Sequence, residues 1–579
     1  MIGSRAKGLV PCAAAALLAL AGCGGGDGAS GGRSDGGTGA GGPDGAAGVR
    51  SEGVPGVGAA LPGIEVANAV APGPIPPEEA FRLVTQGTYG ATLEDIEAAA
   101  AMGPHAWIDA EMAKPATLML PRMRSQGDTS RWNEQVNLWW RIALDADDQL
   151  RQRVAFALSE IFVVSSAQNG LGGEQEALAN YYDILVRNAF GNYRTLLEEV
   201  TLNPVMGEYL SMKGNRKPDP ARNIRPDENF ARELLQLFTI GLERLNPDGT
   251  PVPGADGVPL PTYDQETVEA FAHVFTGWHF RDVDDFAWAK REDYLSPMVA
   301  YPEFHDDGPK TLLGGVTLPA GQGAEADLRM ALDNVFAHPN VGPFVSRQLI
   351  QRLVTSNPSP GYVRDVAAVF DGNAAGERGS LASTIKAILV HREAREGHLD
   401  APDTFGKLKE PLLRVTQLWR AFPPTSIGPD FNYAWATNEL AQAPLAARTV
   451  FNFFRPDFAQ PGAIAEAGLV SPEFEIHDET SIVTITSRLL AGSIWNNDQR
   501  DTGNSRSIQI GIGREVALEP DPEALLDHLD LLLLGGRMSE GLRAEALRLM
   551  AARRGDQAVL RTSEAIFLIV SSPEAAVQL

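Results

Sequence analysis

Residues 227–241 read Asp-Glu-Asn-Phe-Ala-Arg-Glu-Leu-Leu-Gln-Leu-Phe-Thr-Ile-Gly, and this stretch decides the fold class. Its apolar residues Phe230, Leu234, Leu237 and Phe238 recur every three or four positions, which is the spacing of one face of an α-helix. Two acidic side chains and an amide stand at its start, where they satisfy free N–H groups and face the positive end of the helix dipole. The stretch therefore predicts an amphipathic helix with one apolar face.

The same helical pattern extends through most of the chain. Two more apolar stripes have helical spacing, at 268–275 and 328–336. Helix starts are indicated by Pro or a capping side chain in many places, and several glycines indicate helix ends. The starts are Pro77, Thr92 with Asp95, Pro104, Asp147, Pro204, Pro226, Pro339, Pro360, Ser380, Asp478 and Ser539, and the ends are Gly87, Gly103 and Gly535.

Strand signals are sparse. Residues 311–318 predict a small hairpin around Gly314-Gly315, and residues 507–516 predict one short strand. Residues 245–262 are rich in Pro, Gly and Asp and predict a long exposed loop. The expected fold class is thus mainly α, a large multi-helix body with one or two small β-hairpins.

The amino terminus carries an export signal. Basic residues precede a short apolar run, and Leu20-Ala21-Gly22-Cys23 resembles the bacterial lipobox, in which the Cys becomes the lipidated first residue. We expect residues 1–22 to be a lipoprotein signal peptide and Cys23 to carry the lipid that binds the protein to a membrane. The expected location is the cell envelope, at the outer membrane or in the periplasm if the cell is Gram-negative. The alternative is an ordinary cleaved signal with a chance Cys.

Composition divides the rest of the chain and limits its partners. Residues 23–76 are dominated by Gly, Ala, Ser, Asp and Pro and predict a disordered tether, whereas residues 77–579 predict one mainly helical domain. Cys12 and Cys23 are the two cysteines of the chain, so the mature body has no disulfide and no thiol nucleophile. The formal net charge of −25 repels phosphate backbones and makes nucleic acid an unsuitable partner.

The stretch 227–241 resembles the signature of a large bacterial family of exported proteins of unknown function, DUF1800. Further matching segments follow in the order of that family, with Arg82-Leu83, Thr88 to Thr92, Arg151 to Ala155, Thr276-Gly277-Trp278, His305-Asp306, Lys310, His338-Pro339, Ser346-Arg347, Leu349, Val450 to Pro456 and Ser471 to Phe474. The resemblance implies an exported helical protein without an established activity or agreed catalytic residues. It also implies a gene neighbourhood shared with another exported family, DUF1501, which is similar to sulfatases and alkaline phosphatases.

Two places carry candidate chemistry. Arg232 and Glu233 in the signature helix would form a polar cluster aimed into a groove, or else pair with neighbours of a capped core helix in which Glu228 and Arg232 share a face. His305 and Asp306 lie in a loop that leads to Lys310, and they suit metal ligation or a general base oriented by a carboxylate. No specific cofactor is indicated.

Weaker candidates are a helix face and a set of aromatic residues. Glu266, Glu269 and His273 fall on one face of the helix expected at 264–278, for which a solvated face is the preferred interpretation over a metal site or an acid–base pair. Carbohydrate is a candidate ligand, because aromatic faces bind sugar rings. The aromatic residues in question are Trp132, Trp139, Trp140, Trp278, Trp288 and Tyr294.

Two functions follow from these observations. The first is a lipid-anchored binding or assembly protein that works with another exported protein, such as the sulfatase-like neighbour. The second is a hydrolase of the envelope or of external polymers, with His305, Asp306, Glu233 and Arg232 in one cleft and, in one version, a metal held by His305 and Asp306. Convergence of these four side chains in one concave site would favour the hydrolase, and separate structural partners would favour the binding protein.

Overall fold

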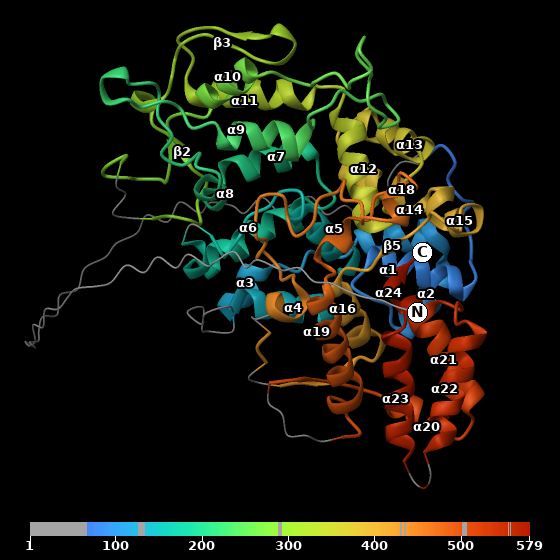
Figure 1. Cartoon of the computed structure of the whole chain (residues 1–579). Coiled ribbons are helices and arrows are strands. Elements are labelled where there is room, and N and C mark those ends of the chain that lie inside the picture. Colours follow the sequence, from blue (N-terminus) through green and yellow to red (C-terminus); the bar gives the residue numbers. More distant parts are fainter. Residues whose placement is uncertain are drawn as a thin grey trace, which may run out of the picture. The chain divides into compact units, whose positions relative to one another are not determined.

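Helices make up most of the structure, as the apolar periodicity predicts (Figure 1). The computed structural model describes residues 66–125, 134–168, 170–287, 292–428, 431–433, 436–500, 506–553, 555 and 557–579. The predicted signal peptide, the lipidation site Cys23 and most of the predicted tether lie outside the described residues, and so do Trp132 and Trp288. No helix of the described residues has the length and apolar character that crossing a bilayer requires.

The α-helices are α1 (Pro77–Gly87), α2 (Leu93–Met112), α3 (Met119–Ser125), α4 (Glu134–Asp145), α5 (Gln149–Ser159), α6 (Gln175–Asn188), α7 (Tyr193–Leu202), α8 (Pro204–Tyr209), α9 (Asn229–Glu233), α10 (Gln265–Val274), α11 (Ala324–Phe336), α12 (Val341–Leu353), α13 (Pro360–Asp371), α14 (Leu381–Val390), α15 (Arg392–Asp400), α16 (Pro411–Ala421), α17 (Ala436–Leu440), α18 (Ala463–Glu466), α19 (Glu479–Leu490), α20 (Gly513–Leu518), α21 (Pro522–Leu534), α22 (Glu540–Ala552), α23 (Ala558–Val570) and α24 (Pro573–Ala576). Short 3₁₀ turns are η1 (Leu171–Gly173), η2 (Pro220–Arg222), η4 (Pro302–Phe304), η5 (Leu313–Gly315) and η6 (Pro472–Ile476), and π-helical segments are η3 (Leu234–Thr239) and η7 (Ala491–Trp495).

The helix ends follow the local chemistry of the sequence. Thr92 and Asp95 form the predicted capping box at the start of α2, and Gly103 interrupts that helix with a φ of 75° before Pro104 resumes it. Gly535 ends α21 in the left-handed conformation, as expected for a C-terminal glycine. Three predicted starts are displaced by a few residues. α9 begins at Asn229 and not at Pro226, and α12 begins at Val341 and not at Pro339. Asp148 and not Asp147 precedes α5, and its carboxylate accepts a hydrogen bond from Thr117 N at 2.9 Å instead of capping the helix.

The signature stretch begins as α9 and continues as the π-helical segment η3, where a regular α-helix was expected. The Thr239 hydroxyl donates to Leu234 O at 2.5 Å, and the N–H of Ile240 donates to Leu235 O at 3.0 Å, five residues back. Phe230, Leu234 and Phe238 are buried as the stripe predicts, whereas Leu237 is half-buried. Single π turns are frequent at functional sites, so this segment marks a place to look for one.

Within the described residues, four two-stranded antiparallel ladders accompany the helices. The predicted hairpin is confirmed as β3 (Lys310–Thr311) and β4 (Thr317–Leu318), and the predicted strand near 510 is confirmed as β7 (Ile508–Ile510), which pairs with β6 (Pro424–Ile427). The other ladders join β1 (Trp278–His279) to β2 (Val299–Ala300), and β5 (Lys407–Leu408) to the C-terminal β8 (Val577–Gln578). The fold class is mainly α, as expected, and the β5–β8 ladder fixes the end of the chain to its middle.

Residues 66–76 pack onto the helices, although composition assigns them to the tether. Val66 is buried, Asn68 Nδ2 donates to Asp365 Oδ2 at 2.6 Å, and Val70 N donates to Val390 O at 2.9 Å. These contacts supply the burial and hydrogen bonds that a Gly- and Ala-rich segment cannot make by itself. The folded part therefore includes these residues and does not begin at Pro77.

Candidate functional site

His305 is a buried structural residue in the loop before β3. Its Nε2 lies 3.1 Å from Asp327 Oδ2, and its Nδ1 lies 3.0 Å from Thr276 O. Lys310 Nζ donates to the same Asp327 oxygen at 2.7 Å. Burial alone would raise the pKa of Asp327, but the hydrogen bonds from His305 and Lys310 outweigh it and lower that pKa. Both ring nitrogens of His305 thus have partners, and the residue joins its loop to α11.

Asp306 has a different histidine partner from the one expected. Its Oδ2 contacts Nδ1 of His273, on α10, and its Oδ1 accepts a hydrogen bond from Gly308 N at 2.8 Å. Burial would raise the pKa of Asp306, but the Gly308 N–H and His273 lower it further than burial raises it. Asp306 therefore orients the imidazole of His273 and not that of His305.

Arg232 and Glu233 lie side by side in sequence but in different surroundings. Arg232 Nη2 donates to Glu228 Oε2 at 2.8 Å, the predicted pairing of residues four apart, and to Gln265 Oε1 at 3.2 Å. Glu233 is buried, its Oε2 has no hydrogen-bond partner among the described residues, and burial raises its pKa. The signature helix thus places one of these charges at the surface and the other in the interior.

A groove of about 710 Å³ lies between α10 and the segment from Asp306 to Gly315. Glu266, Glu269 and His273, the predicted helix face, line it together with Asp306. Of the four residues expected to share a cleft, Asp306 is the one in the groove wall. Among the residues that the structure describes, no three His, Cys, Asp or Glu side chains are grouped so as to hold a metal ion.

The aromatic candidates for sugar binding are mostly core residues. Trp139, Trp140 and Trp278 are at most 3% exposed, and Trp139 and Trp140 pack edge to face. Tyr294 is partly buried against Phe280. The ring faces of these three tryptophans are therefore covered by other side chains.

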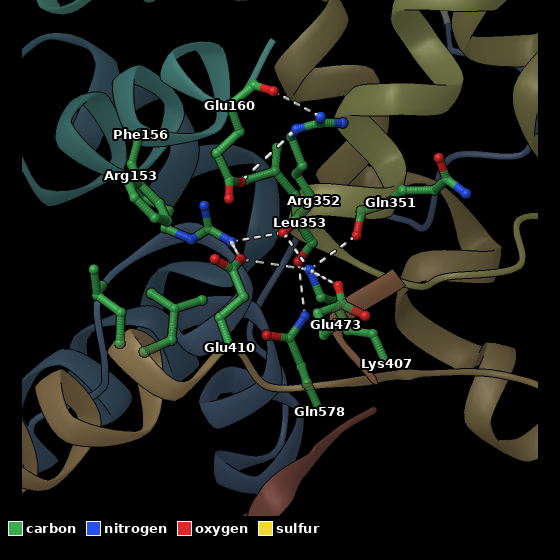
Figure 2. Close-up of polar contacts among 12 residues, drawn as sticks. Arg153, Phe156, Glu160, Gln351, Arg352, Leu353, Lys407, Glu410, Glu473 and Gln578 are labelled. Atoms are coloured by element: carbon green, nitrogen blue, oxygen red, sulfur yellow. Dashed lines mark hydrogen bonds and ion pairs between the residues drawn. The ribbon is translucent and has the colours of Figure 1, made fainter. Parts of the chain in front are cut away.

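A second site was not among the candidates drawn from the sequence. It is a cluster of six buried charged residues, the charge cluster, to which α5, α12, β5, η6 and the residues next to α5 and α16 contribute (Figure 2). Its cations are Arg153, Arg352 and Lys407, and its anions are Glu160, Glu410 and Glu473.

Short contacts connect the members of the charge cluster (Figure 2). Lys407 Nζ lies 2.9 Å from Glu473 Oε1 and donates to the carbonyl oxygens of Gln351 and Arg352, each at 2.9 Å. Arg153 Nη2 donates to the same Arg352 carbonyl at 2.6 Å. Charges are costly to bury, and here opposite charges and backbone carbonyls offset that cost.

Within the charge cluster, the Glu160 carboxyl group has a pKa far above that of an ordinary glutamate. Burial raises its pKa to about 8, and the negative charge of Glu410 acts in the same direction, against Arg352 and Arg153. At neutral pH Glu160 is therefore largely protonated. Arg352 Nη2 donates to the Glu160 carbonyl at 3.0 Å, so the backbone contact does not depend on the carboxyl proton.

A cleft of about 490 Å³ opens above the charge cluster, and we call it the cleft. Glu160, Gln348, Gln351 and Arg352 form its polar floor. Its rim is formed by Gln236, Leu237, Gly241, Leu242, Glu243, Leu245, Phe344, Arg347, Val450, Phe451, Arg455, Pro456 and Asp457, next to Ile161. The π-helical segment η3 supplies Gln236 and Leu237, so the distorted end of the signature helix lies at this cleft.

The comparison with protein families identifies the chain. The family model "Protein of unknown function (DUF1800)" matches residues 82–577, which is most of the sequence. The chain is a DUF1800 protein. No curated protein and no solved structure matches it.

Several of the segments that resemble DUF1800 meet at the cleft and the charge cluster. Arg153, the signature stretch, Arg347, the segment Val450 to Pro456 and Glu473 are separated by up to several hundred residues in sequence. The sequence feature that could have indicated the charge cluster is a charged residue within an apolar helix pattern. Arg153 precedes Val154 in a stripe of buried residues. Pairing across such distances cannot be read from spacing, which is why the cluster was missed.

Proposed function

We propose that this DUF1800 protein is an exported, lipid-anchored binding protein that holds another exported protein at the cleft. The observation that carries the proposal is the convergence of several family segments on one cleft. Fixed sites for a partner need rigid walls, and the buried charge cluster beneath the floor provides them.

The rim of the cleft has the composition of a protein-binding surface. Leu242 and Phe451 are 56% and 45% exposed, and both line the cleft. Exposed apolar side chains around a concavity are the usual anchors of an interface. The sulfatase-like family that neighbours DUF1800 genes is the candidate partner.

The proposed anchor suits this role. A lipid on Cys23 would hold the amino terminus at a membrane, and a flexible linker of about 40 residues would span on the order of 35 Å. The body could then reach partners around its anchor. Two or more acyl chains are needed for lasting attachment.

Photo-crosslinking in the native envelope tests the proposal. Benzoylphenylalanine at position 451 should crosslink to one discrete exported protein. The control is the same residue at position 399, where Leu399 is 70% exposed on α15 and does not line the cleft. Absence of a crosslinked protein at 451, or the same products from both positions, would rule the proposal out.

The second candidate is a hydrolase that uses the groove. It is favoured by the pairing of His273 with Asp306, because a carboxylate-held imidazole in a groove wall is suited to general-base work. In that case His273→Asn should abolish hydrolysis of an envelope polymer by the purified protein. His528→Asn, which removes a histidine paired with Glu515 away from the groove, is the matched control.

A further inference from the structure

One cation on the rim of the cleft has no ion pair. Arg347 is exposed on α12, and no hydrogen bond or ion pair joins it to another described residue. Asp457 attracts it only at longer range. By contrast Arg455, on the same rim, is paired with Glu475 at 3.2 Å. Arg347 is thus a cation available to a ligand.

The floor of the cleft has hydrogen-bond donors that lack acceptors. Gln348 is 7% exposed, and its Nε2 has no partner among the described residues. Arg352 Nε also lacks a hydrogen bond, its nearest carboxylate oxygen being Glu160 Oε2 at 3.8 Å. Buried donors without acceptors are rare and costly, and an arriving oxygen atom would satisfy them after a turn of the Gln348 side chain.

The walls between these donors are apolar. Leu237, Phe344 and Val450 line the cleft together with the exposed Leu242 and Phe451. The volume is within the range of sites for small ligands or a few residues of a peptide. A suitable ligand combines an apolar body with a hydrogen-bond acceptor.

We infer that the cleft binds an apolar group that carries a single carboxylate. Guanidinium and amide N–H groups match the two oxygens of a carboxylate, and Arg347 supplies one unpaired positive charge. Glu243 and Asp457 on the rim disfavour a doubly charged anion such as phosphate. The inference rests on the cleft being the binding site proposed above, and it specifies what the ligand presents there.

Two sources can supply this chemistry, a small organic acid or the carboxyl terminus of a polypeptide. The experiment measures binding of phenylpropionate and of an N-acetylated apolar tripeptide with a free carboxyl end to the full purified chain. Each is compared with its own amide, which has the same shape without the charge. Titration calorimetry should show at least one acid binding about tenfold more tightly than its amide.

Which acid binds identifies the source of the carboxylate. Binding of the tripeptide alone indicates a polypeptide terminus, whereas binding of phenylpropionate indicates that a small acid suffices. Arg347→Gln should remove the preference for acid over amide, while Arg392→Gln, at an exposed arginine of α15 that does not line the cleft, should retain it. Gln348→Glu, which places a carboxylate on the floor, should weaken the acid further.

Equal affinity for acids and amides, or no binding of either at millimolar concentration, would overturn the inference. That result is separable from failure of the proposed function. A discrete crosslink at position 451 without any preference for acids would leave a binding protein whose ligand carries no carboxylate. A preference for acids without any crosslinked partner would leave a small-molecule site.

Discussion

At the scale of single residues, the structure separates charges that support the fold from charges that line the groove and the cleft. His305 and Asp306 were expected to act together, yet each is held by a different partner, Asp327 for the first and His273 for the second. Neighbours in sequence point to opposite sides of an extended loop, so a His-Asp dipeptide does not make a His–Asp pair. Only the pairing of Glu228 with Arg232, which depends on helical spacing, could be predicted from the sequence.

Glu160 makes stability depend on pH in a direction that can be measured. Its pKa is raised from an ordinary 4.5 to about 8 in the folded protein, so the folded state holds the proton more tightly than the unfolded state. The stabilisation is fully present below the unfolded pKa and is lost as pH rises through 8. Between pH 5 and pH 9 the wild type should therefore lose, relative to Glu160→Gln, on the order of a few kcal/mol of unfolding free energy.

Thermal unfolding of both proteins across this pH range checks the prediction. The difference between the two melting temperatures isolates residue 160, because all other titrating groups are shared. Parallel curves for the wild type and Glu160→Gln would mean that Glu160 is ionised in the folded protein.

At the scale of elements, the sequence predicts where helices begin and end better than it predicts how they are distorted. The capping box of α2 and the C-terminal glycine of α21 are confirmed because caps depend on a few adjacent residues. The π-helical segment η3 was not expected, since its apolar residues fit a regular α-helix equally well. The packing of residues 66–76 could not be predicted from composition either, because it depends on distant partners such as Asp365 and Val390.

Substitution of Gly103 tests whether residues 66–76 pack against α2. Its φ is +75°, and a Cβ built there would lie 1.8 Å from Gly73 O, so Gly103→Ala must displace the 66–76 segment. Gly376→Ala is the matched control, with a φ of +74° and no atom within 4 Å of the added Cβ. Both variants carry the backbone strain of about 1 kcal/mol, and Gly103→Ala should cost at least 2 kcal/mol more in unfolding free energy.

Urea unfolding of the two variants provides the measurement. Limited proteolysis should also cut the 66–76 segment faster in Gly103→Ala than in Gly376→Ala. Equal stability of the two variants would show that this segment does not pack against Gly103 in solution.

At the scale of the whole molecule, long-range polar contacts join the chain's end to its middle. Gln578 Nε2 donates to Leu353 O at 2.7 Å and to Val354 O at 3.2 Å, at the C-terminal end of α12 (Figure 2). The fold class could be predicted because helical periodicity is local, whereas these contacts span more than two hundred residues. The charge cluster and the cleft are also formed by residues that lie far apart in the sequence. This explains why the sequence pointed to a different site.

Gln578→Leu should destabilise the fold because it leaves two buried carbonyl groups without donors. We expect a loss of about 1–3 kcal/mol in unfolding free energy. Gln168→Leu is the control, since Gln168 also donates to a distant carbonyl, Arg448 O at 2.6 Å, but at an exposed position. Chemical denaturation should show little change for the control, and equal losses in both variants would contradict the role of burial.

The β5–β8 ladder sets the order in which the molecule can mature. Because β8 pairs with β5 beside Lys407, the surroundings of the charge cluster are incomplete until residues 577–578 have been synthesised. A nascent chain can form its early helices but cannot close this interior until residues 577–578 leave the ribosome, so the charge cluster is completed late in folding. Under the export proposed above, such a late closure would keep the chain competent for transport.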